Sequence, residues 1–140
     1  MSKQVSRAAF RLDRFSFPFA KLDLEGLPRG LTLHNIFSLK GFYRASAGEF
    51  KLSFRYEAID QSSSKAVVQV SCQAIFRFAS NLDFDEIPEF FYQNSVAILF
   101  PYVRAFVSSL TLQANVTPIV LETLNLSSLK EELKNNTTEE

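Results

Sequence analysis

The clearest pattern in the chain is the alternation of apolar and polar residues in two neighbouring runs. Residues 49–59, EFKLSFRYEAI, place their aromatic and aliphatic side chains on one face and Lys, Ser, Arg and Glu on the other. Ala66–Phe78 alternates in the same way, and the polar segment DQSSSK separates the two runs. A period of two is typical of strands that are buried on one side. We therefore predict an antiparallel hairpin with one solvated face.

Residues 7–20, RAAFRLDRFSFPFA, also alternate, but the pattern changes phase midway. The phenylalanine and leucine of the first half have even numbers. The apolar residues of the second half have odd numbers: Phe15, Phe17 and Phe19. A strand whose apolar residues change sides requires a bulge, which we place at residues 13–14. Pro18 has no amide hydrogen for a neighbouring strand, so this strand is expected at an edge of the sheet.

Residues 21–48 contain apolar residues without a clear period and are interrupted by Pro28 and the glycines. We interpret this segment as a long crossover loop with room for a short strand around residues 31–33. Loops of this length in a compact domain usually have a function or cross from one strand to another.

A helical spacing follows the segment SNLDFDE. Pro88 suits a first helical turn, and the acidic residues before it complement the helix dipole. Apolar residues then recur around most of the helix circumference as far as residues 113–115, where Asn115 can adopt the left-handed conformation that ends a helix. Pro101 lies in the middle, where it removes a backbone hydrogen bond at a cost of about 3 kcal/mol. Either the helix begins again there, or the kink serves an assembly.

The C-terminal part starts with an extended apolar segment, VTPIVLETLNL, and continues into a short helix over residues 128–134. Ser128 and Glu131 have the spacing of a capping box, and Leu129 and Leu133 form a narrow apolar stripe. We expect residues 1–134 to form a single domain and residues 135–140 to be a flexible tail.

Composition limits the class of protein. The 140 residues suffice for one domain with its own core. The 15 phenylalanines exceed what a monomer of this size needs inside, so we expect some of them to contact a partner, unless Phe simply replaces Leu in the core. Fifteen basic and 15 acidic residues argue against a nucleic-acid surface. Without a signal-like or long uninterrupted apolar run, we expect a soluble, cytoplasmic protein that does not insert into a membrane.

Catalytic chemistry is not expected. His34 is the only histidine, which excludes a cluster of histidine ligands. It could pair with Cys72 as a nucleophilic dyad, but Cys72 falls on the apolar face of a strand and fits a small buried residue better. A single cysteine also excludes an internal disulfide. The acids of LDFDE fit a helix start better than a metal site, and four glycines do not supply a phosphate loop. We predict no enzyme, metal or cofactor.

The segment ILFPYVR resembles the protein-export chaperone SecB, whose long helix carries a very similar Leu-Phe-Pro-Tyr-x-Arg sequence. The similarity covers residues 95–129 and includes NVTPIVLETLNLSSL; upstream, the order of the elements is similar. The resemblance implies an α+β fold, in which a four-stranded antiparallel sheet with a long crossover loop carries one long and one short C-terminal helix on one face. It also implies a homotetramer, a dimer of dimers with the long helices packed between the dimers.

The resemblance implies an ATP-independent holdase that binds unfolded or precursor polypeptides, keeping them competent for export and translocation. Binding would use apolar surface between the loop, the sheet and the C-terminal helix. The client-binding candidates are Phe17, Phe19, Ile36, Phe37, Phe42, Tyr43, Leu124, Leu126, Leu129 and Leu133. The candidates for the oligomer interface are Leu99, Tyr102, Val103, Phe106 and Leu110.

Two departures from the family bear on partners. Export members dock on the translocase ATPase SecA through carboxylates on the exposed sheet face and through a C-terminal tail. Here the chain is neutral, that face of the second hairpin strand carries Gln69, Ser71 and Gln73, and the tail NNTTEE lacks basic residues. SecA is therefore a weaker expectation than unfolded chains.

Two alternatives remain open. One is a dedicated SecB-like chaperone for a single client, such as an antitoxin in a toxin–antitoxin–chaperone system. The other is a structural or small-ligand domain that keeps only the fold, with Phe42 and Tyr43 buried in a closed groove.

Overall fold

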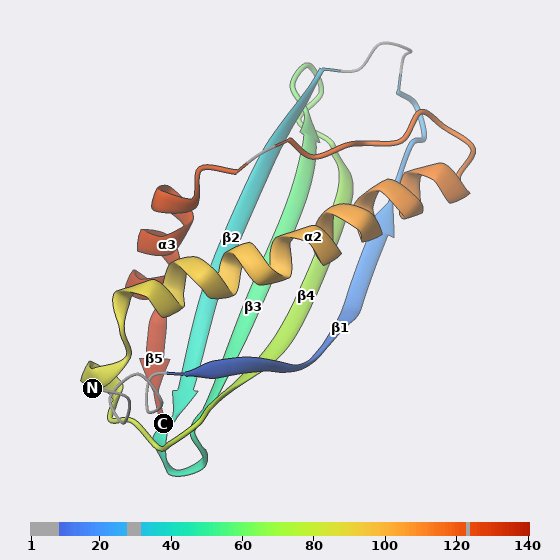
Figure 1. The fold of residues 1–140 in the computed structure, drawn as a ribbon. Helices are drawn as coiled ribbons and strands as arrows, with labels where there is room; N and C mark the ends of the chain where they lie inside the picture. Colours follow the sequence, from blue (N-terminus) through green and yellow to red (C-terminus); the bar gives the residue numbers. More distant parts are fainter. Residues whose placement is uncertain (1–8, 28–31, 123) are drawn as a thin grey trace.

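A five-stranded sheet with a long helix across one face forms the body of the molecule (Figure 1). The computed structural model describes residues 9–27, 32–122 and 124–140. The strands are β1 (Phe10–Leu22), β2 (Leu33–Arg44), β3 (Glu49–Asp60), β4 (Ala66–Phe78) and β5 (Thr137–Glu139). Their order is β1-β4-β3-β2-β5, and β5 runs parallel to β2 while the other pairs are antiparallel. The predicted α+β class is confirmed, but the sheet is mixed and five-stranded rather than antiparallel and four-stranded.

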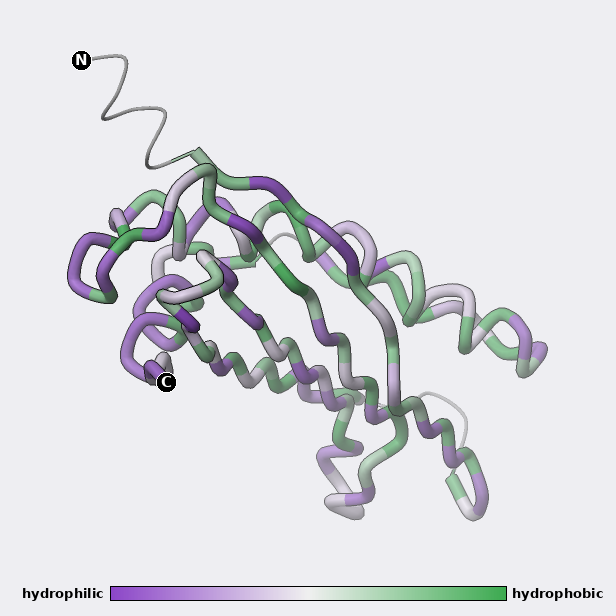
Figure 2. The backbone as a smooth tube through the Cα atoms, turned by 90° about the horizontal axis from the view of Figure 1, so that it is seen from below, coloured by the Kyte–Doolittle hydropathy of each residue, from purple (hydrophilic) through white to green (hydrophobic). Residues whose placement is uncertain are grey.

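The predicted hairpin is present as β3 and β4. Its alternating residues are buried on the inner face, toward the helix, and partly exposed on the outer face. Figure 2 shows the corresponding alternation of hydropathy along the strands.

The interpretation of residues 21–48 as one long loop is wrong. Residues 33–44 form β2, which pairs with β3 over its whole length, from Leu33 opposite Asp60 to Arg44 opposite Glu49. The chain turns into β3 through a short 3₁₀ turn, Ala45–Ala47. The crossover from β1 is thus limited to residues 23–32, and part of the short strand predicted around residues 31–33 lies outside the described residues.

Strand β1 lies at the edge of the sheet, as Pro18 predicts. Its pairing with β4 shifts between Leu12 and Arg14, which confirms the predicted bulge. A second shift, between Ser16 and Phe19, was not predicted. It carries Phe19 to the outer face of the sheet, opposite Ser71.

The long helix α2 (Glu89–Gln113) follows a 3₁₀ turn, Phe84–Glu86, and continues through Pro101 without restarting. Pro88 is its N-cap rather than part of its first turn. Asn115 follows its end with a φ of 60°, in the left-handed region predicted for it.

The short helix α3 (Leu126–Asn135) begins two residues earlier than predicted. Its cap is Asn125, whose side chain accepts a hydrogen bond from the Ser128 amide at 3.2 Å, so the predicted capping box at Ser128 is wrong. Residues 137–139, predicted to lie in a flexible tail, form β5 instead.

The core lies between the inner face of the sheet and one side of α2. Phe91 is at its centre, with ring centroids 4.7 Å from Phe50 and 4.8 Å from Phe10 and Phe78. Of the phenylalanines, only Phe19 and Phe90 are prominently exposed, at 43% and 48%. Most of the phenylalanine therefore replaces aliphatic residues in the core, which was the alternative to a partner-binding role.

By length and composition alone, α2 could cross a membrane, and 39% of its most apolar window is buried inside the structure. Core helices of soluble proteins have the same length and composition, so one such helix is weak evidence for a membrane span.

Candidate functional site

The outer edge of β2 is covered along only part of its length. The Leu39 amide donates to Glu132 Oε2 at 2.6 Å, and Asn136 Nδ2 donates to the Leu39 carbonyl at 3.1 Å. The Gly41 amide donates to the Asn136 carbonyl at 3.2 Å, and β5 pairs with residues 41–43. From Leu39 onward, α3 and β5 thus satisfy the backbone groups that point away from β3.

Upstream of Leu39 the same edge is open. Residues of an antiparallel strand alternate in the direction of their backbone groups, so those of Asn35 and Phe37 point the same way as those of Leu39. On the side away from β3, no strand of the described ranges pairs with β2 at these two residues. Their outward amide and carbonyl groups have no partner among the described residues, which is the arrangement that accepts an additional strand.

Apolar side chains flank this open edge. Phe37 points to the inner face, with ring centroids 5.4 Å from Tyr56 and 6.5 Å from Phe100. Helix α3 runs beside β2 in the same direction (Figure 1) and contacts it. Leu126 lies six residues before Glu132, or about 9 Å along the helix, which brings it toward the level of Phe37. We define the β2-edge surface as the outward backbone groups of Asn35 and Phe37 with the side chains of Phe37, Phe100, Leu124 and Leu126.

These four side chains are only partly buried. Val120, in the segment that crosses the inner face between α2 and α3, is 59% exposed. Sequence reasoning missed the open edge because it placed residues 33–38 in a loop. It also left out Phe100 and Val120, although LFPY and TPIV marked both as apolar residues beside a proline.

The structure divides the client-binding candidates among different environments. Phe37, Leu124 and Leu126 belong to the β2-edge surface. Phe17 is on the inner face and stacks on Phe106, with centroids 4.1 Å apart. Leu129 and Leu133 are buried at 7% and 0% exposure, where they anchor α3.

The remaining client-binding candidates are on other surfaces or in the core. Phe19, Ile36 and Phe42 lie on the outer face. Tyr43 is fully buried, and its hydroxyl donates to the Leu82 carbonyl at 2.6 Å. Tyr43 is therefore a core residue, as the fold-only alternative predicted for it, but it lies in a strand and not in a closed groove.

The candidates for the oligomer interface are also divided. Leu99 and Val103 lie on the buried side of α2 with 0% exposure, so they are core residues and their prediction as interface residues is wrong. Phe106 packs on Phe17, and Leu110 is partly buried. Tyr102 is 46% exposed, although its ring lies 4.4 Å from that of Phe15 in β1, so it is at the flank of α2 beside the sheet. The other large exposed apolar side chains of this helix are Phe90, Ile98 and Leu112.

The titratable groups of the described residues include a buried thiol and no cluster of metal-ligating side chains. Cys72 is buried in β4, and burial raises the pKa of its thiol to about 12, which keeps it protonated. Across residues 9–27, 32–122 and 124–140, no three His, Cys, Asp or Glu side chains are grouped as metal ligands would be. The β2-edge surface therefore offers apolar side chains and backbone hydrogen-bonding groups.

Comparison with known proteins decides the family. Residues 42–136 match the family described as SecB, preprotein translocase subunit SecB. The chain belongs to the SecB family. SecB-family proteins are chaperones and not enzymes, in agreement with the surface described above.

A solved structure shares the SecB fold. It is the Mycobacterium tuberculosis Rv1957 SecB-like chaperone in complex with a ChAD peptide from the Rv1956 HigA1 antitoxin. It superposes with a TM-score of 0.68 over 89% of this chain and 92% of that one, at 18% identity. A curated relative, the uncharacterized protein MJ0357 of Methanocaldococcus jannaschii, is 45% identical over 58 residues. That match spans 39% of this chain and 37% of the relative's length.

Proposed function

We propose that this SecB-family protein is an ATP-independent holdase that binds unfolded or precursor polypeptides at the β2-edge surface. The observation that carries the proposal is the open edge at Asn35 and Phe37 beside partly buried apolar side chains. A polypeptide that has not folded exposes unpaired backbone groups together with apolar side chains. The β2-edge surface offers complementary groups for both.

The client would then be recognised through two kinds of contact, with the backbone and with apolar side chains. An extended client segment adds to β2 through backbone hydrogen bonds, which do not depend on its sequence. Alternate side chains of that segment point toward Phe37, Phe100 and Leu126, which require only apolar character. Such a surface binds many unfolded chains and has little affinity for folded ones, as a holdase requires.

The alternative function is a dedicated chaperone for one client, such as an antitoxin. The Rv1957 structure, whose bound peptide comes from an antitoxin, supports this alternative at the level of the fold. A panel of unrelated denatured clients separates the two functions, because a dedicated chaperone protects only its own partner.

Further features belong to the same proposal. We propose a cytoplasmic protein acting in protein export, with residues 1–134 and the following strand β5 in one domain. We also propose a dimer of dimers assembled through the outward side of α2. SecA docking through carboxylates is a weaker part of the proposal, because the outward side chains of β4 include Gln69, Ser71 and Gln73.

The proposal is tested by suppression of aggregation with a pair of variants at one position. Asn35→Pro removes the outward amide hydrogen, and edge strands tolerate proline. Asn35→Ala is the matched control, since both changes lose the side-chain amide that accepts from the Tyr56 hydroxyl at 2.7 Å. Light scattering of denatured clients, diluted without ATP, measures the protection.

The expected result is strong protection by the wild type and by Asn35→Ala, and about tenfold weaker protection by Asn35→Pro. Circular dichroism checks that both variants are folded. Equal protection by the two variants would show that clients do not add to β2. If the wild type protects none of the clients, the general holdase function is wrong and the dedicated chaperone becomes the remaining proposal.

A further inference from the structure

The outer face of the sheet, on the side opposite α2, is left uncovered by the described helices. Its side chains are the partly exposed members of the alternating pattern in β3 and β4. Register extends the face to β2, where Lys40 lies opposite Ser53, and to β1, where Arg11 lies opposite Arg77. This surface is distinct from the β2-edge surface and takes no part in the proposed holdase function.

Charge is distributed unevenly over the two sides of the molecule, although the whole chain is neutral. Three carboxylates lie on the outer face of strands β1–β4: Asp13, Glu49 and Glu57. Eight cations lie on the same face: Arg11, Arg14, Lys21, Lys40, Arg44, Lys51, Arg55 and Arg77. Positive charge is therefore in excess on this face.

Three of these cations, Lys21, Lys40 and Lys51, form no ion pair with a described residue, and Lys21 is near the Asp23 carboxylate, whose pKa is lowered mainly by the hydrogen bond from Lys65 and in part by the charge of Lys21. Asp13 is shared by Arg11, Arg14 and Arg77 at 3.0–3.1 Å, and Glu49 also pairs with Arg77 at 3.1 Å. Lys40 and Lys51, in contrast, form no ion pair with any residue that the structure describes. A lysine without a carboxylate neighbour is available to an external anion.

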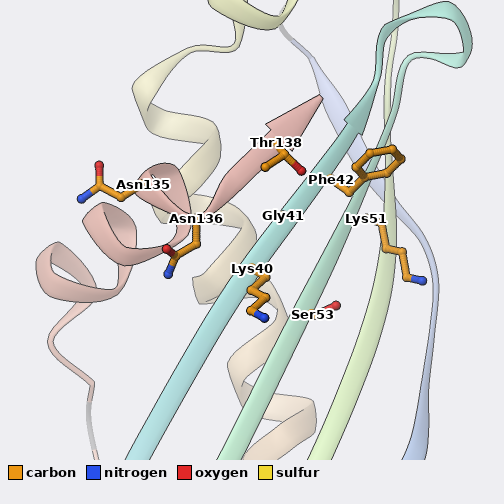
Figure 3. A pocket seen from close by; sticks show the side chains of 8 residues that line it. All are labelled: Lys40, Gly41, Phe42, Lys51, Ser53, Asn135, Asn136 and Thr138. Atoms are coloured by element: carbon orange, nitrogen blue, oxygen red, sulfur yellow. The ribbon is translucent and has the colours of Figure 1, made fainter. Parts of the chain in front are cut away.

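A cleft of about 580 Å³ lies at these two lysines (Figure 3). Lys51 is diagonal to Lys40 across β2 and β3, and such neighbours have Cα atoms about 7–8 Å apart. A carboxylate between them can accept from both amines. The other lining residues are uncharged: Gly41, Phe42, Ser53, Asn135, Asn136 and Thr138.

We propose that the outer face binds an acidic segment of a partner protein, with one carboxylate of that segment seated between Lys40 and Lys51. Apolar side chains among the cations favour a polypeptide over a nucleic acid. Phe19 is 43% exposed, with the Arg55 guanidinium 5.7 Å from its ring centroid, and Ile36 is 37% exposed. A peptide that combines carboxylates with aliphatic residues complements this mixture, whereas a phosphate backbone requires a continuous basic surface.

The experiment is fluorescence anisotropy with a labelled peptide of alternating glutamate and alanine. A peptide with glutamine in place of glutamate and a labelled oligothymidylate are run in parallel. The variants are Lys40→Gln/Lys51→Gln, which removes both charges, and Lys40→Arg/Lys51→Arg, which keeps them. Arg104→Gln, on α2, is a control that removes a cation from another surface.

We expect the glutamate peptide to bind, with an affinity that falls as salt rises and is about tenfold weaker in the double glutamine variant. The double arginine variant and Arg104→Gln should keep the wild-type affinity. Equal binding of the glutamine peptide, or tighter binding of oligothymidylate, would overturn the proposal. Suppression of aggregation should be the same in all variants, so failure here and failure of the holdase function are distinguishable.

Discussion

At the scale of single residues, Gly41 of β2 lies where side chains of β3 and of the distant strand β5 both come close to the backbone. A Cβ at this position would lie 2.5 Å from Thr137 Oγ1 and against the Phe50 ring. Glycine within a strand often marks such a close approach of other chain segments. Here the missing side chain leaves space for Thr137 of β5 and for the ring of Phe50 in the core.

Gly41→Ala is expected to lower the free energy of unfolding by about 1–3 kcal/mol, because Phe50 and Thr137 must move to accommodate a methyl group. Urea denaturation measures the loss. The control, Ser38→Ala on the outer face of the same strand, should change stability by less than about 0.5 kcal/mol. A Gly41→Ala protein as stable as the wild type would show that Phe50 and Thr137 of β5 can move aside without loss of folding free energy.

The buried thiol of Cys72 predicts a dependence of stability on alkaline pH. Burial raises the pKa of this thiol to about 12 from its usual 9.0, so the unfolded chain loses the proton first. Stability is then complete below pH 9.0 and falls as the pH rises toward 12. Burial also raises the pKa of Tyr56 and Tyr92 to about 12, but their usual value is 10.0.

Between pH 9.0 and 10.0 the thiol is therefore the first of these buried groups whose ionisation in the unfolded chain lowers stability. Cys72→Ala should show a smaller loss of stability over this interval, measured as the midpoint of urea denaturation. If the urea midpoint falls equally with pH in the wild type and in Cys72→Ala, the thiol is not the cause of the loss. This comparison does not depend on how stable the variant is at neutral pH.

At the scale of elements, strands β3 and β2 show what could be predicted and why. In β3 the inward residues are uniformly apolar and the outward ones polar, so the period of two is visible. In β2 the inward residues include Asn35, held by the Tyr56 hydroxyl, and Gly41, while Ile36 and Phe42 point outward. Apolar residues on both faces obscure the alternation, so the sequence pattern predicts a loop where β2 is found.

The candidate site was predicted only in part for the same reason. The extent of the open edge of β2 depends on how much of that edge β5 and α3 cover. Strand β5 has only three residues, Thr137–Glu139, which are too few to show an alternating pattern. The second bulge of β1 separates Phe17 from Phe19, although their spacing suggests one face. Long-range pairing sets both features, whereas the hairpin and the helices follow from local periodicity.

Helix α2 allows a direct test of its central proline. Pro101 is exposed and leaves the helix continuous, so Pro101→Ala should restore a backbone hydrogen bond. We expect unfolding to require about 1–3 kcal/mol more in urea denaturation. The control Ser109→Ala, also exposed on α2, should add about 0.5 kcal/mol or less. A loss of stability in Pro101→Ala would mean that the proline is needed for packing.

At the scale of the whole molecule, α2 carries several large apolar side chains that the described chain leaves partly uncovered. Phe90, Ile98, Tyr102 and Leu112 are all more than a third exposed. An exposed apolar stripe on a helix is typical of an interface between subunits. It fits the assembly of dimers that we propose.

Ile98→Glu is expected to reduce the mass of the particle in solution, because a buried charge without a partner opposes association. Light scattering coupled to size-exclusion chromatography measures the mass. Gln93→Glu is the matched control, since it adds the same charge at another exposed position of α2. An unchanged mass in the Ile98→Glu protein would place the contact between subunits elsewhere.

The excess of cations on the outer face has a consequence for how the molecule moves in an electric field. Because the net charge is zero, the excess of positive charge on one side is balanced by negative charge elsewhere, and the molecule has a dipole moment. A distant charged surface would exert a torque on it and little net attraction. Such a protein turns its sheet toward a polyanion before it touches it, and at about 0.1 M salt this orientation is confined to within about 10 Å of the surface.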